Sequence, residues 1–429
     1  MQILNIQNSN FIKNTFVLTL GTAIAQVLPM LLYPALGRLY TPEQFAVLAA
    51  ITSFVSIIST FVTGKYENAI FIADTDKDAV CLFSVALVMS LSICFILTIP
   101  LYVFSDSFTV YLGFSTLDSW IQICISASFF MAIFNIYNEW CVRYEYFKRL
   151  SINKIVNSAG ISLFKLVFAY TNFANIGLVA GDWIGRFFSS VVCLFSIKQL
   201  DTSCFCDIQI SDIINVLRKY REYPMFNMPA QLLNSIGISS PIFILNYFYN
   251  QTDVGYYAMT MSVLTLPVNI ISLSLRDVFR KKASDILIVE GSFKSFFVKT
   301  LFILFVVTSI LSICVYPILP WLFKFVLGSQ WGNSGVFAQY FIPMIALDFI
   351  AMSLSGSLLV SKKLKYNFYW QVYYVILTIL TLYIAGTCSL NISNTLIIYS
   401  IARSSAYVLL IYISFKSSIN FCVSILAII

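Results

Sequence analysis

Long apolar stretches separated by short polar breaks are the dominant pattern along the chain. A helix needs about 20 apolar residues to cross the core of a bilayer. Twelve stretches of this kind lie at 14–36, 45–63, 80–104, 119–138, 156–173, 176–196, 224–248, 255–275, 295–318, 337–360, 367–387 and 394–415. The pattern therefore predicts an all-α polytopic membrane protein with about 12 transmembrane helices.

The lysines and arginines are distributed unevenly between the two sides of these predicted helices. When the N-terminus is placed in the cytoplasm, 20 of the 26 basic residues fall on the cytoplasmic side. Only Arg38 and Lys324 fall in loops on the other side. Because loops that stay inside carry an excess of Lys and Arg, the distribution predicts that both termini are cytoplasmic.

The composition excludes several classes of protein. Hydrophobic residues make up 59% of the chain and charged residues 10%, with a mean hydropathy of +0.86. A soluble domain has about a quarter of its residues charged, so soluble enzymes, nucleic-acid-binding domains and secreted disulfide scaffolds are excluded. The net charge of +7 reflects the excess of Lys and Arg in the cytoplasmic loops. We therefore do not interpret it as a nucleic-acid-binding surface, and we expect no nucleic-acid partner. The chain has no His, and we expect no metal or cofactor.

Two six-helix halves are predicted, because the longest inside connection falls near the middle of the chain. The expected parts are an N-terminal lobe at 1–197, a cytoplasmic amphipathic linker at 198–223 and a C-terminal lobe at 224–429. The similar loops 39–49 and 248–258 follow the first helix of each half and support a duplication. Part of the linker has apolar residues at the spacing of one helix face: Ile210, Ile213, Ile214 and Leu217. We expect this amphipathic helix to lie on the inner membrane surface.

Polar side chains form a stripe on the first two predicted helices of each half. Ser and Thr in such stripes routinely form hydrogen bonds between membrane helices, and this structural explanation stays open. Four stripes at repeat-related positions favour a water-filled cavity between the halves. The amides in these stripes that we expect to line the cavity are Gln26, Gln231, Asn234 and Asn269.

Charged residues also occur inside the predicted spans. A charge at the bilayer centre costs about 2.5–3.5 kcal/mol on insertion scales, so it usually faces a cavity or a partner. Asp182 and Arg186 are four residues apart and could form a local ion pair. Asp348 could pair with Arg403 across helices. Lys165 has no acid nearby in the sequence, although Asp182 on the next helix could serve.

The balance of these charges predicts a positive cavity. Within the spans there are two acids, Asp182 and Asp348, and three cations: Lys165, Arg186 and Arg403. Further cations lie near the mouths of the cavity at Arg38, Lys65 and Arg276. A positive, water-filled cavity suits an anionic or phosphorylated substrate. Lys165 is the strongest single candidate for contact with such an anion.

Two loops carry recognisable motifs. Arg38-Leu-Tyr-Thr-Pro-Glu-Gln-Phe45 resembles the signature that follows the first helix of bacterial polysaccharide flippases, with Ala46 where the family often has Gly. Gly64-Lys-Tyr-Glu-Asn-Ala-Ile70 resembles the segment after their second helix. From about 10 to 415, the chain resembles a Wzx-type O-antigen or capsule repeat-unit flippase of the MATE-like MOP exporter superfamily. Weaker landmarks are Tyr223-Pro224, Val254-Gly-Tyr-Tyr257 and Trp331.

The resemblance implies a transporter and no enzymatic chemistry. Two six-helix lobes would rock about a central cavity in the bacterial inner membrane. An undecaprenyl-diphosphate-linked oligosaccharide would pass from the cytoplasmic to the periplasmic leaflet, while its prenyl tail stays in lipid. The implied partners are this lipid-linked glycan, membrane lipid and other membrane proteins of polysaccharide assembly.

The expected roles of individual residues follow from this mechanism. We expect Lys165, Arg186 and Arg403 to contact the diphosphate, and Arg276 to capture it at the inner mouth. The amides Gln26, Gln231, Asn234 and Asn269 would contact sugars. Asp182 and Asp348 would couple transport to protons or sodium, or form ion pairs. The signature residues Arg38, Lys65 and Glu67 would hold loop structure or gate the mouths.

Two other functions stay open at this point. A small-solute or multidrug exporter of the same fold would commonly bind organic cations through acidic cavity residues, whereas this cavity is predicted to be cationic. A polytopic polysaccharide polymerase or ligase would need a sizeable outer loop with catalytic residues. The predicted outside loops are short and contain no paired carboxylates.

Overall fold

The computed structural model describes residues 2–103, 121–171, 176–198, 209–361 and 363–419. Every regular element in these ranges is a helix, so the predicted all-α class is confirmed. The chain divides into two compact units, Met1–Phe243 (unit 1) and Ile244–Ile429 (unit 2). The lobe and linker boundaries predicted at 197 and 223 stay a prediction.

The membrane spans coincide with the predicted apolar runs. Eleven helical segments in the described part of the chain are long and apolar enough to cross a membrane. The remaining run, predicted at 119–138, is occupied by α6 (Ile121–Arg143). The fold is therefore that of a polytopic helical membrane protein. The cytoplasmic placement of the termini stays a prediction.

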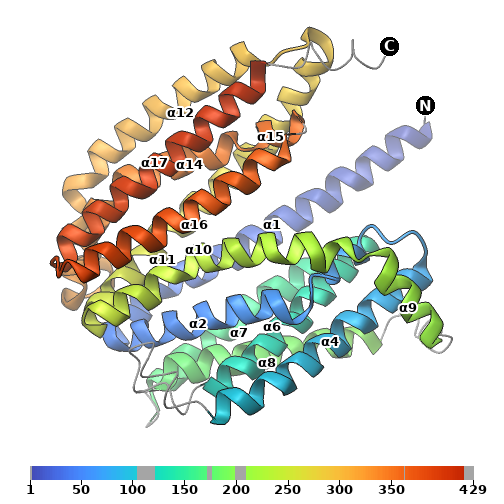
Figure 1. Cartoon of the computed structure of the whole chain (residues 1–429), viewed down its shortest axis with the longest axis horizontal. Helices are drawn as coiled ribbons and strands as arrows, with labels where there is room; N and C mark the ends of the chain where they lie inside the picture. Colours follow the sequence, from blue (N-terminus) through green and yellow to red (C-terminus); the bar gives the residue numbers. More distant parts are fainter. Residues whose placement is uncertain (1, 104–120, 172–175, 199–208, 362, 420–429) are drawn as a thin grey trace. The chain divides into compact units, whose positions relative to one another are not determined.

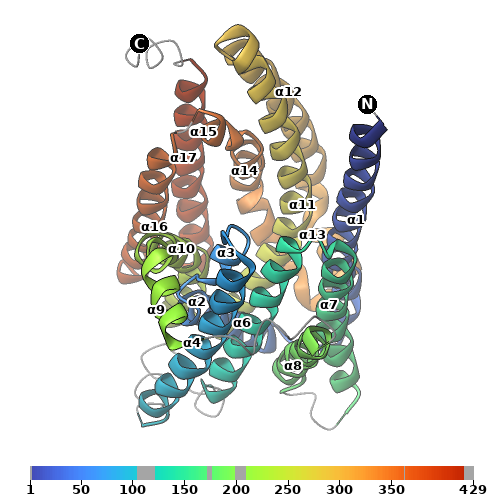
Figure 2. The same ribbon diagram turned by 90° about the vertical axis from the view of Figure 1, so that its right-hand side faces the viewer.

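Unit 1 is a bundle in which α7 is covered by α1 on one side and by α8 on another (Figure 2). The helix α6 packs against α2, α4 and α8. The helices of this unit are α1 (Gln2–Leu39), α2 (Pro42–Val62), α3 (Glu67–Ile70), α4 (Asp76–Val103), α6, α7 (Phe147–Ala169), α8 (Gly177–Lys198), α9 (Ile210–Lys219) and the greater part of α10 (Met228–Phe248), which follows a π-helical turn at Tyr223–Asn227.

The helices α7 and α8 approach each other closely because glycine recurs on one face of α8. Gly177, Gly181 and Gly185 are spaced four residues apart. A Cβ atom on Gly185 would lie 2.4 Å from the Cα atom of Ile161, and one on Gly181 would lie 2.5 Å from the backbone nitrogen of Lys165. Small residues allow membrane helices to pack backbone against backbone. This contact sets the position of Lys165 against α8.

Hydroxyl groups on α7 attach this helix to α1. The Ser151 hydroxyl donates to the carbonyl oxygen of Val17 at 3.0 Å, and the Ser158 hydroxyl donates to that of Ala25. Gly21 on α1 leaves room for Ser151, since a Cβ atom there would lie 2.3 Å from the Ser151 Cβ. These two hydroxyls of α7 therefore help to hold the two helices together, a role that Ser side chains commonly have in membrane bundles.

Unit 2 is organised around α14, which packs against α11, α12 and α17 (Figure 1). The helix α16 packs against α17. With 40 residues, α11 is about 60 Å long, roughly twice the thickness of the hydrocarbon core. The helices are α11 (Gln251–Glu290), α12 (Lys294–Val315), α13 (Leu319–Leu327), α14 (Gly332–Leu354), α15 (Gly356–Val360), α16 (Leu364–Thr387) and α17 (Ile392–Ile419).

The amphipathic helix of the predicted linker is α9, and it packs on protein through part of its apolar face. Val216 is buried, and Leu217 packs beside it in a hydrophobic cluster with residues of α3 and α4. Ile210 and Ile214 are 76% and 50% exposed. Because α9 docks on residues of α3 and α4, only this exposed edge remains for the membrane surface predicted from the sequence. The linker residues 199–208 lie outside the described residues.

Three ion pairs fasten α9 to the start of α4 and to Asp74, two residues before it. The Lys77 ammonium lies 2.7 Å from the Asp212 carboxylate. The Lys219 ammonium lies 2.8 Å from Asp74 and 2.6 Å from Asp78. Charge therefore adds to apolar packing in placing α9 against α4.

Candidate functional site

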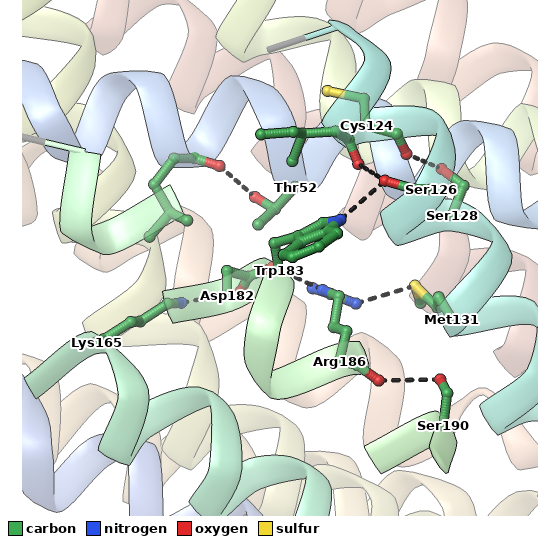
Figure 3. A network of polar contacts seen from close by, with 12 residues as sticks. Thr52, Cys124, Ser126, Ser128, Met131, Lys165, Asp182, Trp183, Arg186 and Ser190 are labelled. Atoms are coloured by element: carbon green, nitrogen blue, oxygen red, sulfur yellow. Dashed lines mark hydrogen bonds and ion pairs between the residues drawn. The ribbon is translucent and has the colours of Figure 1, made fainter. Parts of the chain in front are cut away.

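Three charged side chains from α7 and α8 meet inside unit 1 (Figure 3). The Lys165 ammonium lies 2.9 Å from Asp182 Oδ1, and Arg186 Nε lies 2.6 Å from Asp182 Oδ2. The lysine and arginine side chains are 12% and 16% exposed, and the aspartate is 5% exposed. One carboxylate therefore serves two cations, and the cationic cluster Lys165–Asp182–Arg186 carries a net charge of +1.

Two of the three ion pairs considered from the sequence occur in this cluster. The pair Asp182–Arg186 follows from four-residue spacing on α8. The pair Lys165–Asp182 joins α7 to α8 and depends on the close glycine packing of these helices. The sequence offered ion pairing and substrate contact as alternatives. The uncompensated charge of the cluster allows both, because each cation keeps donors beyond those used by Asp182.

The cations of the cluster have spare hydrogen-bonding capacity. An ammonium has three donors and a guanidinium five. In the described part of the chain, the Lys165 ammonium donates to Asp182 alone. Arg186 donates through Nε to the same carboxylate, and its Nη1 contacts the sulfur of Met131 at 3.3 Å. Since a thioether is a weak acceptor, an anion could displace that contact.

The signature loop after α1 supports the cluster through the backbone of Lys165. The Tyr40 hydroxyl donates to the backbone carbonyl oxygen of Lys165 at 2.7 Å. Tyr40 is 1% exposed, and burial raises the pKa of its phenol to about 12, so it stays a donor at neutral pH. The sequence motif identified this loop, but gave no indication that Tyr40 reaches α7.

Aromatic side chains of α8 pack against α6 beside the cluster. The Trp183 indole donates to the Ser126 hydroxyl of α6 at 2.8 Å. Its ring stacks on Phe187 with centroids 6.1 Å apart, and Phe130 of α6 contacts both rings. These contacts fix the face of α8 from which Arg186 projects.

In unit 2, Arg403 is enclosed by tyrosines of α16 and α17. Its guanidinium donates to the hydroxyls of Tyr399 and Tyr407 and lies 4.4 Å from the ring centroid of Tyr374. The residue is 7% exposed. The two tyrosines use one donor each on Nη1 and Nη2, and among the described residues the buried Nε has no hydrogen-bond partner, so the predicted contact of Arg403 with a diphosphate stays a prediction.

Asp348 of α14 interacts electrostatically with both Tyr407 and Arg403 of α17. Tyr407 accepts a hydrogen bond from Arg403 at 2.9 Å. Within the described residues, Asp348 and Arg403 form no direct ion pair closer than 4 Å, so the ion pair considered from the sequence is not formed. Asp348 is 9% exposed, and among the residues that the structure describes its Oδ1 has no hydrogen-bond partner.

The second signature loop contains a buried ion pair. The Lys65 ammonium lies 3.2 Å from the Glu67 carboxylate, and the two side chains are 9% and 2% exposed. Gly64 and Lys65 both have positive φ, +57° and +60°, a region that favours glycine. The loop is thus held in a strained turn by the pair, which supports the structural role considered for it. Arg38 is exposed in the last turn of α1.

The remaining predicted residues lie on three helices, α1, α10 and α11. Gln26 is partly exposed on α1, and the Gln231 amide donates to Asn227 at 2.7 Å. Asn234 and Asn269 are exposed on α10 and α11, and Arg276 is partly exposed on α11. No three Asp, Glu or Cys side chains gather where they could hold a metal ion, as far as the described residues extend.

Comparison with solved structures places the fold. An inward-facing multidrug resistance MATE family transporter of the MOP superfamily matches with a TM-score of 0.72 at 14% identity, over 92% of this chain and 96% of that one. The lipid II flippase MurJ, inward closed, has the same TM-score and identity over 94% and 87%. A MOP superfamily transporter from Pyrococcus furiosus has a TM-score of 0.61 at 14% identity over 95% and 97%.

Sequence comparison gives the family. No curated protein sequence matches the chain. The profile of one family, described as polysaccharide biosynthesis protein, matches residues 35–335, which include both signature loops and the cationic cluster. With the MOP superfamily fold, this match shows that the chain belongs to the polysaccharide biosynthesis protein family.

Proposed function

We propose that this protein is a flippase for an undecaprenyl-diphosphate-linked oligosaccharide, an O-antigen or capsule repeat unit. It moves this lipid from the cytoplasmic to the periplasmic leaflet of the bacterial inner membrane by alternating access. Family membership and the multi-pass fold support the transporter class. No covalent chemistry is required of the protein.

The observation that carries the proposal is the net positive charge of the Lys165–Asp182–Arg186 cluster. A diphosphate and a sugar unit cannot cross hydrocarbon unaided at a useful rate, because burying charge and polar groups without partners is costly. Charge-assisted hydrogen bonds from Lys and Arg to phosphate oxygens lower this cost. The partial exposure of both cations is consistent with access by a headgroup.

The site residues receive the following roles in the proposal. Lys165 and Arg186 contact the diphosphate, while Asp182 holds both cations in place when no substrate is bound. Arg276 captures the headgroup at the inner mouth. Amides on three helices contact sugars: Gln26, Gln231, Asn234 and Asn269. Arg403 stabilises unit 2 through its tyrosines, and Asp348 is the remaining candidate for coupling to an ion.

An exporter of small solutes is the second candidate, because one similar structure is a multidrug resistance transporter. An exporter of organic cations would be served by a net negative site. The positive cluster in unit 1 therefore favours an anionic substrate.

Deletion of the gene, followed by complementation, tests the proposal. The pool of lipid-linked oligosaccharide and the surface polysaccharide are both quantified. We expect complete single units to accumulate on the inner face, with loss of surface polymer. Lys165→Gln should complement poorly at normal membrane abundance. Lys148→Gln, which removes an exposed charge from the same helix, should complement fully.

Two results would contradict the proposal. Single units that reach the outer face without being polymerised would indicate a polymerase or ligase. An unchanged pool with intact surface polymer would leave an exporter of small solutes as the better explanation.

A further inference from the structure

A second lysine of α7 lies on the same face of the helix as Lys165. Lys154 precedes Lys165 by eleven residues, which is three helical turns, or about 16 Å along the helix axis. It is the eighth residue of α7. The charge pattern of the sequence groups Lys154 with the loop cations, whereas the structure places it inside a helix that is long and apolar enough to span the membrane.

The surroundings of Lys154 leave its charge incompletely compensated. Its ammonium donates to the Thr22 hydroxyl of α1 at 3.1 Å. No carboxylate lies within 4 Å of it in the described part of the chain. The acid that acts on it electrostatically is Glu139 of α6, which is influenced in turn by Lys65 and Glu67. A partly buried ammonium normally has a paired acid, and this one has a neutral hydroxyl.

We propose that Lys154 is a second contact for the diphosphate of the lipid-linked glycan, one that precedes Lys165 and Arg186 on the transport path. This inference rests on the proposed function. The two lysines lie three turns apart on one helix, so the two contacts lie in series along α7. Two moderate sites in series also allow faster release than one tight site.

The distance between the two sites suits this role. An isolated positive charge attracts an anion weakly across about 16 Å when water and protein screen it. The headgroup therefore needs a contact of its own at the end of α7 where Lys154 lies. Lys154 offers two ammonium donors beyond the bond to Thr22, and the Thr22 hydroxyl can itself donate to a phosphate oxygen.

A purely structural role is the alternative. Ser151 and Ser158, on the same face, attach α7 to α1, and Lys154 could do the same through Thr22. A structural lysine would affect stability and all ligands alike. A headgroup contact would affect only ligands that carry phosphate.

Binding to the purified full-length protein separates these roles. Undecaprenyl diphosphate and uncharged undecaprenol serve as probes, with binding measured by native mass spectrometry and thermal stability measured alongside. We expect Lys154→Gln to weaken binding of the diphosphate about tenfold, the effect of one charge-assisted hydrogen bond. Binding of undecaprenol should be unchanged in Lys154→Gln. Lys154→Arg should bind undecaprenyl diphosphate as the wild type does, and so should the exposed control Lys148→Gln.

The outcomes distinguish this inference from the proposed function. If Lys165→Gln weakens diphosphate binding and Lys154→Gln does not, the second contact is refuted and the flippase proposal stands. If neither variant affects binding, both proposals fail. Equal losses of diphosphate and undecaprenol in Lys154→Gln, with a lower melting temperature and no rescue by arginine, would establish the structural role instead.

Discussion

The hydroxyl of Tyr40 donates to the backbone carbonyl oxygen of Lys165, so the loop between α1 and α2 is bonded directly to the turn of α7 that carries the cationic cluster. Gly177, the first residue of α8, lies against the same phenol, and a Cβ atom there would be 2.4 Å from the Tyr40 hydroxyl. The signature motif therefore has a physical purpose in this chain. It fixes α7 and α8 where Lys165 meets Asp182.

Tyr40→Phe tests this connection. The variant keeps the buried ring and removes one hydrogen bond, so we expect the free energy of unfolding to fall by about 1 kcal/mol. Binding of undecaprenyl diphosphate should weaken as Lys165 loses its fixed position. Tyr170→Phe is the matched control, because Tyr170 is 79% exposed. If both variants melt and bind alike, Tyr40 does not position Lys165.

Asp182→Asn should be more damaging than Lys165→Gln. The first change leaves two largely buried cations without a countercharge, and loss of one partner from a buried ion pair costs about 3–5 kcal/mol. The second change leaves the pair Asp182–Arg186 intact. We expect Asp182→Asn to reduce both melting temperature and membrane abundance, and Lys165→Gln to reduce transport alone. Equal stability of the two variants would show that Asp182 does not hold the cluster together.

The glycine face of α8 gives a prediction about helix packing. In Gly185→Ala the new methyl group would meet the backbone of Ile161 at 2.4 Å, so α7 and α8 must separate, at a cost of about 1–3 kcal/mol. In Gly160→Ala the nearest atom is 3.7 Å away, and no separation is needed. The melting temperature should be lowered in Gly185→Ala only. A normal melting temperature for Gly185→Ala would contradict close packing at this point.

The sequence predicts the helices and the intramembrane charges well, because both depend on local composition. The spacing of Asp182 and Arg186 on one helix also identifies their ion pair. The pairing of Lys165 with Asp182 depends on how α7 and α8 approach. The four-residue spacing of glycines on α8 indicates a close helix contact. It does not say which helix makes that contact.

Arg403 shows where reasoning from the sequence falls short. Tyr399 and Tyr407 are four residues before and after it, so their contact could be expected from helical spacing. The covering ring of Tyr374 comes from another helix, and no local pattern indicates it. The structure adds tyrosine partners for two donors of this intramembrane arginine, and its contact with a diphosphate stays a prediction.

Arg403→Lys should destabilise unit 2. A lysine cannot donate to both hydroxyls with the geometry of a guanidinium or stack in the same way on Tyr374, so we expect a loss of about 2 kcal/mol. Transport per folded molecule should stay near that of the wild type. Arg280→Lys is the control, since the Arg280 side chain is 51% exposed. Normal stability combined with lost transport would restore the diphosphate contact predicted from the sequence.

The docking of α9 should depend on pH through Asp212. Its hydrogen bond with Lys77 lowers the pKa of the Asp212 carboxyl. A lowered pKa in the folded state stabilises docking above the pKa of the free aspartate, and this contribution is lost as the pH falls through the folded value. Docking should therefore weaken below about pH 4.

The acid sensitivity of α9 can be measured by amide hydrogen exchange, corrected for intrinsic rates. Between pH 7 and pH 3 the protection of α9 should fall. In Lys77→Gln, protection should already be lower at pH 7 and change less with acid, because Asp212 has lost the partner that lowers its pKa. The Lys219 pairs with Asp74 and Asp78 remain in this variant, so α9 should stay partly docked. Identical pH profiles for the wild type and Lys77→Gln would show that the pair Lys77–Asp212 does not contribute to docking.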